Sequence, residues 1–151
     1  MRKADREIKD FNELEEILAK SQVCYLSLID ADYPYTLPLN YGYRDKKLYF
    51  HCATEGKKLD LLRINPNCSF AVSIDHELIT DGIASHCTMK YRSVCGKGII
   101  SELQSDEEKA FALQVLMEQY VPDKVWDFKG GCFDRVGILC LDIEKMTGKK
   151  R

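Results

Sequence analysis

Apolar residues recur at helical spacing near the start of the chain. Residues 10–20 begin with Asp10 and Glu13, which form the D-x-x-E pattern of a helix start. One face of this segment then carries four apolar residues: Phe11, Leu14, Ile17 and Leu18. The spacing predicts an amphipathic helix that packs against a core through this face.

A second helical pattern covers residues 105–120. Ser105 and Glu108 form a capping box at its start. The predicted inward row of this helix is Ala110, Leu113, Met117 and Tyr120. A shorter helix is predicted over residues 56–64, and Asn65-Pro66 ends it.

Short runs of apolar and β-branched residues, separated by turn residues, fill most of the remaining chain and predict strands. The predicted strands are 22–29, 35–43, 48–53, 68–74, 89–103 and 135–150. Because they follow one another closely, we expect mainly antiparallel pairing, with helix 56–64 inserted after the third strand. Barrel closure hides sheet edges, so the pattern predicts a small, mainly β barrel with flanking helices in one domain, residues 1–151.

Three features interrupt these strands. Pro38 lies inside strand 35–43, and its missing N–H group excludes that strand from a normal central position. Gly96 and Gly98 lie inside strand 89–103 and are expected to allow a bend or a bulge. Residues 75–87 show only weak periodicity, so they predict a loop.

The composition is typical of a globular protein, with 45% apolar and 30% charged residues. The net charge of −2 gives no general basic field, so nucleic acid is not expected as a partner. No apolar run approaches the roughly 20 residues that span a bilayer, so no membrane association is expected. Residues 1–16 are charged and contain no apolar segment, so no secretion signal is predicted and the expected location is the cytoplasm.

The seven cysteines also favour a reducing compartment, because their number is odd and no C-x-x-C pair occurs. Several lie in strand-like apolar runs, where a thiol acts as a small buried apolar group. His86, Cys87 and Cys95 are near one another in sequence, but their spacing fits no standard zinc pattern. No metal site is therefore expected.

Two lysines occupy an unfavourable position at the start of helix 56–64. Lys57 and Lys58 lie in its first turn, where the helix dipole and the free N–H groups favour anions over cations. A bound phosphate would remove this penalty, and Gly56 would let the backbone approach it closely. The alternative is that both lysines are ordinary solvated surface charges.

Strand 48–53 ends just before these lysines and has two different faces. One face carries Leu48, Phe50 and Cys52, and the other carries Tyr49, His51 and Ala53. If the first face packs in the core, Tyr49 and His51 project together toward solvent, a partner chain or a ligand. The charge of His51 can change near neutral pH, which is notable beside an anion site, although most strand histidines are merely partly exposed.

Residues 89–94 offer further candidate phosphate ligands. In a strand, Tyr91 and Ser93 face one way, while Lys90 and Arg92 face the other. Hydroxyl and guanidinium groups both bind phosphate well. Ordinary strand alternation produces the same pattern and remains the alternative.

Four segments of the chain together resemble a known family: DREIKDFNELEEIL, YPYTLPLNYGY, LYFHCATEGKKLDLL and TMKYRSVCGKG. They are similar to the split-barrel, flavin-binding superfamily of pyridoxamine 5′-phosphate oxidase-like proteins, and most of all to its nitroimidazole-resistance branch. The resemblance extends from about Asp5 to the C-terminal EKMTGKKR. Its most specific part is FHxAxEGKKLDLL, which follows PLNYGY.

This resemblance implies a six-stranded antiparallel split β-barrel of the Greek-key type and a homodimer that binds FMN at its interface. It places Lys57 and Lys58 at the FMN phosphate. It also places three residues near the same phosphate: Tyr91, Arg92 and Ser93. The implied flanks of the flavin ring are Leu37, Pro38, Leu39 and Asn40 in one strand and Phe50, His51, Cys52 and Ala53 in another. His51 would lie by the reactive face, as the candidate catalytic residue.

Two large aromatic residues, Trp126 and Phe128, lie in the otherwise polar, Gly-rich loop DKVWDFKGG. Aromatic residues in such a loop usually cover a core edge, a partner chain or a ligand. The resemblance favours a partner chain close to the flavin. Packing of Trp126 on its own barrel is the alternative.

The resemblance implies an FMN-dependent oxidoreductase that reduces small molecules such as nitroimidazoles. NAD(P)H would bind only transiently, because no G-x-G-x-x-G motif occurs. The chain has no evident equivalent of the C-terminal substrate-binding residues of the pyridoxamine-phosphate oxidases proper, so vitamin B6 oxidation is not expected. Two alternatives stay open: a flavin store, sensor or antioxidant module without turnover, and a relative that binds haem or a deazaflavin.

Overall fold

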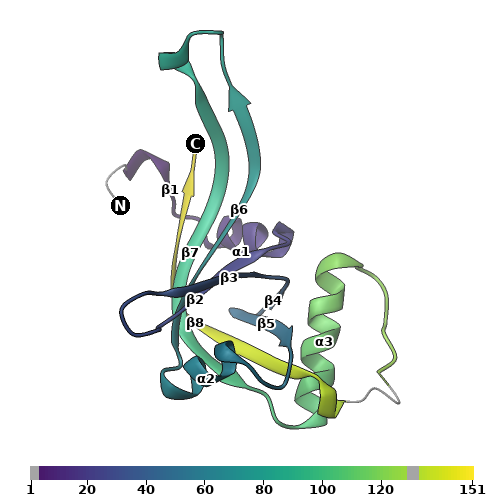
Figure 1. Ribbon diagram of the computed structural model, residues 1–151. Coiled ribbons are helices and arrows are strands. Elements are labelled where there is room, and N and C mark those ends of the chain that lie inside the picture. The colour runs from purple at the N-terminus through teal and green to yellow at the C-terminus, as the bar shows by residue number, and fades with distance from the viewer. Residues whose placement is uncertain (1–3, 129–132) are drawn as a thin grey trace.

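The strands of the computed structural model, which describes residues 4–128 and 133–151, form one antiparallel sheet (Figure 1). They are β1 (Glu7–Ile8), β2 (Cys24–Leu28), β3 (Tyr35–Leu39), β4 (Gly42–Arg44), β5 (Lys47–Cys52), β6 (Asn67–Ile79), β7 (Thr88–Glu102) and β8 (Gly137–Lys150). Their hydrogen-bonded order is β3-β2-β6-β7-β8-β5-β4, and β1 pairs with β8.

In the described part of the chain, three α-helices accompany the sheet: α1 (Phe11–Lys20), α2 (Lys57–Ile64) and α3 (Asp106–Tyr120). Short 3₁₀ turns occur at Ala4–Arg6, Ala84–His86 and Phe133–Arg135. Among the residues described, no helix is both long enough and apolar enough to cross a membrane.

The two ends of the sheet meet at one corner of the chain. The edge strands are β3 and β4, and only Asn40 and Tyr41 separate them in sequence. The sheet must therefore curl until its ends come together, which gives a barrel that is split at this corner. The predicted class, an antiparallel split barrel with flanking helices, is confirmed. Pro38 lies in the edge strand β3, as its missing N–H group requires.

Over the residues that the structure describes, the sheet has eight strands, not the six predicted. The predicted strand 35–43 is divided into β3 and β4 at the corner. Strand β1 contains only Glu7 and Ile8, which pair with Lys149 and Gly148 of β8. Two residues are too few to produce a strand pattern in the sequence.

Strands β6 and β7 extend beyond the rest of the sheet as a long two-stranded arm (Figure 1). The predicted loop 75–87 is wrong over its first part, because β6 continues to Ile79. The register of the arm shifts between Ile74 and Glu77, which breaks the alternation of side chains. Most side chains of the arm are also exposed on both faces, so burial imposes no two-residue period that the sequence could show.

The core lies inside the curled sheet. Its most deeply buried side chains include Leu26, Leu28, Leu48, Phe50, Val94, Leu139 and Leu141. Helix α1 adds Leu14, Ile17 and Leu18, as predicted. The prediction for Phe11 is wrong: it is 41% exposed at the start of the helix, with the Lys46 ammonium group over its ring. The bulge expected in β7 is confirmed by a register shift between Lys97 and Gly98.

Helix α3 begins at the predicted capping box, in which Ser105 and Glu108 each accept a hydrogen bond from the other's backbone N–H group. Its buried residues are Ala112, Val115 and Leu116. The prediction of which residues of α3 face inward is therefore wrong. The predicted residues are only partly buried: Ala110, Leu113, Met117 and Tyr120. Gly42 of β4 explains the difference: α3 backbone atoms lie 2.6 Å from the position that a Cβ atom of Gly42 would occupy. The missing side chain lets one particular face of α3 approach the sheet.

Residues at the end of α3 hold the split corner closed. The Tyr120 hydroxyl accepts hydrogen bonds from the N–H group of Tyr41 (3.1 Å) and from Nδ2 of Asn40 (3.2 Å). It donates one to the carbonyl of Gln22 (2.6 Å). Nε2 of the preceding residue, Gln119, lies 2.8–2.9 Å from three carbonyls at and just beyond the end of α1. These contacts join both edge strands to two helices.

Replacing Gly42 with Ala should destabilise the protein by about 3 kcal/mol. The added Cβ atom would meet the backbone of Val115 and Leu116, which cannot turn away as a flexible side chain could. The measurement is urea unfolding followed by circular dichroism. Ser69→Ala, at an exposed strand position, is the control and should change the free energy of unfolding by less than about 0.5 kcal/mol. Equal stability of the two variants would contradict the close packing of α3 on β4.

Candidate functional site

Helix α2 begins without a capping side chain. Its N-cap is Gly56, whose φ of 117° is rarely adopted by residues with a side chain. The Gly56 carbonyl accepts hydrogen bonds from the N–H groups of Leu59 and Asp60 (2.9 and 3.2 Å). Within the described residues, the N–H groups of Lys57 and Lys58 have no hydrogen-bond partner. Apart from the two neighbours of Gly56 in the chain, no described residue has an atom within 4 Å of the place a Gly56 Cβ atom would take. The helix start therefore presents open space and free N–H groups to an anion.

The side chain of Lys57 joins this helix start to the β2–β3 hairpin. Its ammonium group lies 2.6 Å from a carboxylate oxygen of Asp30. It also lies over the ring of Tyr35, 5.1 Å from the ring centroid. The hydrogen bond to Asp30 raises the pKa of Lys57. Lys57 is therefore charged and held in position, with part of its charge neutralised by Asp30.

Lys58 lies near strand β5. Burial raises the pKa of the Cys52 thiol, and the positive charge of Lys58 opposes this rise. Only residues 53–56 separate the end of β5 from the start of α2. The Lys58 ammonium group forms no ion pair with any residue in the described ranges 4–128 and 133–151. The start of α2, the start of β3 and the end of β5 therefore meet at one place. The structure brings together Lys57, Lys58 and Cys52 of the predicted site residues.

The two faces of β5 differ as predicted, with one exception. Leu48 and Phe50 are completely buried in the core, and His51 on the opposite face is exposed. Tyr49 shares the face of His51 but is only 7% exposed, and its ring meets that of Phe111 edge to face at 5.8 Å. Helix α3 packs beside this part of the face, so Tyr49 does not project into solvent together with His51.

Strand β3, the other predicted flank of a flavin ring, alternates in burial. Leu37 and Leu39 are partly buried, and Pro38 is exposed. Asn40, just beyond the strand, donates hydrogen bonds to the Gln22 carbonyl and the Tyr120 hydroxyl. The side chain of Asn40 thus holds the corner, and a ligand at β3 would meet Pro38 and the unpaired edge of the strand.

One chain does not bring all the predicted phosphate ligands together. The three in β7 are Tyr91, Arg92 and Ser93. Arg92 bonds the carboxylate of Asp75 through Nε (2.7 Å) and Nη2 (2.6 Å), and Nη2 also contacts Glu16 (3.3 Å). Across the sheet, Gly98 of β7 pairs with Cys68 of β6, and Cys68 pairs with Leu28 of β2. Leu28 in turn pairs with Tyr35 of β3, so Gly98, not Arg92, is in line with the hairpin that contacts α2. Six residues of strand separate these two positions, a distance of about 20 Å.

Trp126 packs on helix α3 of its own chain. Its backbone N–H group donates to Oε1 of Gln114 (3.1 Å), and the ammonium group of Lys124 lies 3.7 Å from its ring centroid. Its indole Nε1 is buried and has no hydrogen-bond partner among the described residues. Trp126 is therefore joined to helix α3 of its own chain, and contact with a partner chain stays a prediction.

The residues considered for a metal site are not gathered. His86 and Cys87 lie at the tip of the arm, where His86 bonds Asp81 at 2.7 Å, and Cys95 lies eight residues beyond Cys87 in β7. In the part of the chain that the structure describes, no three His, Cys, Asp or Glu residues form a group that could hold a metal ion.

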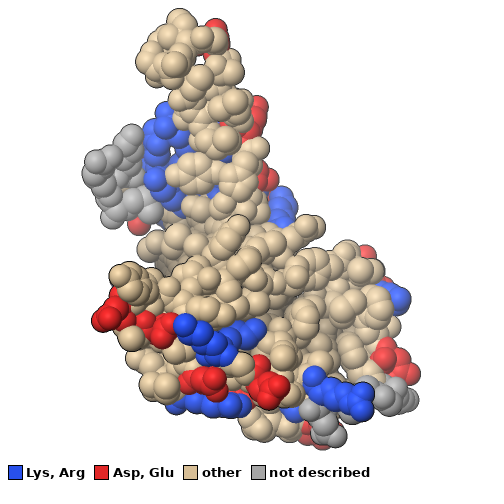
Figure 2. Space-filling model, in the orientation of Figure 1, with Lys and Arg blue, Asp and Glu red and all other residues tan. Residues whose placement is uncertain are grey.

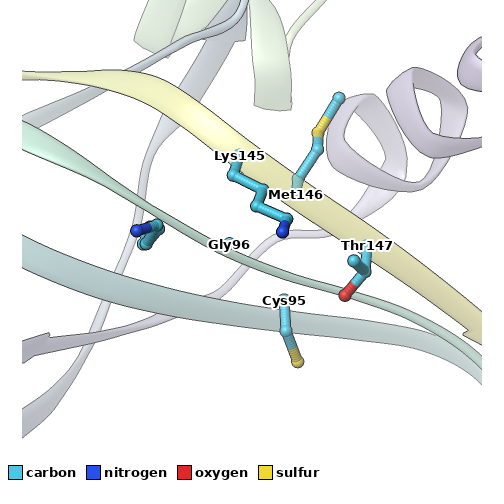
Figure 3. A pocket seen from close by; sticks show the side chains of 6 residues that line it. Cys95, Gly96, Lys145, Met146 and Thr147 are labelled. Carbon is cyan, nitrogen blue, oxygen red and sulfur yellow. The ribbon is translucent and has the colours of Figure 1, made fainter. Parts of the chain in front are cut away.

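A hollow of 280 Å³ lies between β7 and β8, where Lys97 and Lys145 are paired across the strands. Figure 3 shows Cys95 and Thr147 on one side of the strands and Met146 on the other. None of the predicted site residues lines this hollow. On the face shown in Figure 2, acidic and basic side chains intermix over the lower body, so no field of one sign marks it as a charged surface.

A curled antiparallel sheet with a lysine-bearing, uncapped helix start defines a small split-barrel protein with a candidate anion site. The profile of the pyridoxamine 5′-phosphate oxidase family matches residues 10–150, and the chain belongs to this family. No curated protein sequence matches the chain significantly.

Solved structures with the same fold include a candidate 5-nitroimidazole antibiotic resistance protein from Bacteroides thetaiotaomicron. It is 27% identical, with a TM-score of 0.84 over 95% of this chain and 86% of that one. The FAD and haem binding protein from Mycobacterium smegmatis is 17% identical, with a TM-score of 0.82 over 96% and 73%. An FAD-binding protein from Mesorhizobium loti is 23% identical, with a TM-score of 0.70 over 97% of each chain. At 17% and 23% sequence identity, the Mycobacterium and Mesorhizobium structures show only that the fold is shared.

Sequence reasoning missed Asp30 and Tyr35, which position Lys57. In the sequence, Asp30 directly follows the predicted strand 22–29, and Tyr35 is the first residue of the predicted strand 35–43. The two lie more than twenty residues before Lys57 in sequence. No local pattern could connect them with helix α2, because the contacts depend on where the β2–β3 hairpin packs.

Proposed function

We propose that this protein binds FMN and reduces small molecules such as nitroimidazoles. The observation that carries the proposal is the start of α2, where Gly56 leaves open space beside two lysines whose N–H groups have no partner among the described residues. Membership of the pyridoxamine 5′-phosphate oxidase family supports it. So does the similarity to structures named as a nitroimidazole resistance candidate and as FAD-binding proteins.

The chemistry of the α2 start suits a phosphate group. A phosphate monoester carries nearly two negative charges at neutral pH and accepts several hydrogen bonds. Lys58 offers an uncommitted ammonium group, and Lys57 offers one that Asp30 holds in place. The backbone N–H groups of these residues add donors along the positive end of the helix dipole.

The flavin ring would lie against β3 and β5, between residues 37–40 and 50–53. Exposed Pro38 and exposed His51 would face it from these strands. We assign Tyr91, Arg92, Ser93 and Trp126 to a second copy of the chain in a homodimer. The reason is that six residues of strand, about 20 Å, separate Arg92 from Gly98, the β7 residue in line with the hairpin that contacts α2.

The bound flavin would supply the electron-transfer chemistry, and the protein would bind, orient and shield it. His51 would position a substrate on the exposed face of the ring or hold a proton near it. NAD(P)H would bind transiently as the reductant, since the chain has no dinucleotide-binding motif. The cytoplasmic location expected from the sequence stays a prediction.

Haem binding is the second candidate, because the M. smegmatis relative is named as a protein that binds both FAD and haem. A deazaflavin and a flavin store without turnover are the remaining alternatives. An absorption spectrum of the purified protein distinguishes flavin from haem, because FMN gives a flavin spectrum and haem gives a Soret band. Bleaching of a flavin spectrum by NADPH, followed by reoxidation with a nitroimidazole, distinguishes a reductase from a store.

Replacing Lys57 and Lys58 with Ala should weaken FMN binding by a factor of about 100 or more, because two charge-assisted contacts are lost. Fluorescence titration with FMN measures this, and riboflavin, which lacks the phosphate, should bind the wild type much more weakly. Lys97→Ala/Lys145→Ala is the matched control, since it also removes two neighbouring lysines, here at exposed positions of β7 and β8. Unchanged FMN affinity in the Lys57/Lys58 variant would refute the phosphate assignment.

His51→Ala should leave FMN affinity within a few-fold of wild type, because the exposed ring of His51 is not among the phosphate ligands. Reductase turnover should fall by about 10²–10⁴-fold if His51 is a general acid, and by less if it only positions substrate. We favour positioning, since a flavin can take protons from solvent. Steady-state kinetics and FMN titration on the same samples give both values. A large loss of FMN affinity with normal turnover per bound flavin would contradict this role.

The protein should be a dimer at micromolar concentration, with a mass twice the 17.4 kDa of one chain. The reason is that the proposed FMN site needs side chains from β7 that lie about 20 Å along the strand from Gly98, the β7 residue in line with the hairpin that contacts α2. Size-exclusion chromatography with light scattering measures the mass. A monomeric mass with full FMN binding would show that one chain completes the site.

A further inference from the structure

A hollow of 350 Å³ lies between the first turns of α3 and the outer face of β5 and β8. Its volume is within the range of about 300–1,000 Å³ found for small-molecule sites. Tyr49 and Cys140 form its buried floor, and Leu103 and Phe111 line its sides. None of the residues proposed to hold the flavin lines it.

Phe111 is the most informative residue of this hollow. It is 46% exposed, and the buried face of α3 uses other residues, so Phe111 is not required for the core. Its ring is fixed all the same: it meets the Tyr49 ring at 5.8 Å, and the Arg44 guanidinium group lies 5.6 Å from its centroid. A rigid, half-exposed aromatic ring beside a second ring offers a surface against which another ring can pack.

The rim of the hollow is acidic. Lys47 is neutralised by Asp142, which lies 2.9 Å from its ammonium group. Glu108 accepts the capping hydrogen bonds of Ser105. Glu107 forms no hydrogen bond or ion pair with a residue in the described part of the chain, and its exposed carboxylate is available at the rim.

We propose that this hollow is a second ligand site, which binds a small aromatic amine. The aromatic ring of the ligand packs against Phe111 and above Tyr49, where it replaces water over an apolar floor. Its ammonium group lies at the rim beside Glu107. The site is separate from the α2 start, so it is independent of the proposed flavin chemistry.

The test uses the full chain with whatever flavin it carries, and three probes of similar shape: phenethylamine, phenethyl alcohol and phenylpropionate. Isothermal titration should show that the amine binds about five- to tenfold more tightly than the carboxylate, as expected for one exposed charge at the rim. The alcohol should be intermediate. Absence of amine binding at millimolar concentration overturns the proposal.

Two variants locate the site. Phe111→Ala should weaken binding of all three probes about tenfold through the loss of ring packing. Phe11→Ala, which removes a phenylalanine of similar exposure (41%) on α1, should change none of them. Glu107→Gln should bring the amine and the carboxylate within about twofold of each other and leave the alcohol unchanged.

The outcomes are distinct from those for the flavin site. Equal amine affinity in wild type and Phe111→Ala, or an amine preference that survives Glu107→Gln, overturns the proposal. Flavin content is measured on the same samples by absorption. Loss of flavin with intact amine binding would count against the proposed reductase function and would leave the proposed amine site standing.

Discussion

The fold depends on the hydrogen bonds that close the corner at Asn40 and Tyr41. Tyr41 is fully buried, and its hydroxyl donates to the Leu18 carbonyl at 2.5 Å. Its backbone N–H group donates to the Tyr120 hydroxyl. Leaving such buried groups unpaired would cost about 1–3 kcal/mol each. The corner is therefore stable only while the last turns of α1 and α3 remain in contact with it.

Closure of this corner also fixes the candidate site. Strand β3 leads through the corner into β4, and β4 pairs with β5. The corner thus sets the position of β3 relative to β5, the two strands that Lys57 and Lys58 approach. A change in the corner would move Tyr35 relative to Cys52 and alter the space between the lysines. The geometry of the candidate anion site is in this sense a consequence of how the sheet is closed.

The two lysines at the start of α2 destabilise the helix locally, and Lys57 also joins the helix to Asp30. Cations at a helix start oppose the helix dipole by about 0.3–1 kcal/mol each when exposed. Asp30 offsets part of this cost for Lys57, although Lys57 is exposed and such an ion pair contributes little to stability by itself. Lys58 has no such partner among the described residues. This asymmetry is consistent with a site in which one ammonium group is positioned in advance and the other stays free for a ligand.

Local signals in the sequence were sufficient wherever a residue's neighbours in the chain decide its environment. Asp10 and Ser105 cap their helices, Pro38 lies in an edge strand, and His51 lies opposite the core face of β5. The position of Lys57 and Lys58 at an uncapped helix start was also evident, because Gly56 and Pro66 bound that helix.

The tertiary structure alone decided what depends on contacts between distant segments. The buried face of α3 follows from the missing side chain at Gly42, which no pattern within the helix indicates. Tyr49 is covered by α3, and Lys57 is held by Asp30, because segments remote in sequence pack there. The extension of β6 to Ile79 depends on pairing with β7 in an arm whose exposed faces carry no apolar period. Sequence determines local geometry through short-range sterics and hydrogen bonding, whereas packing between distant elements is settled only when the whole core forms.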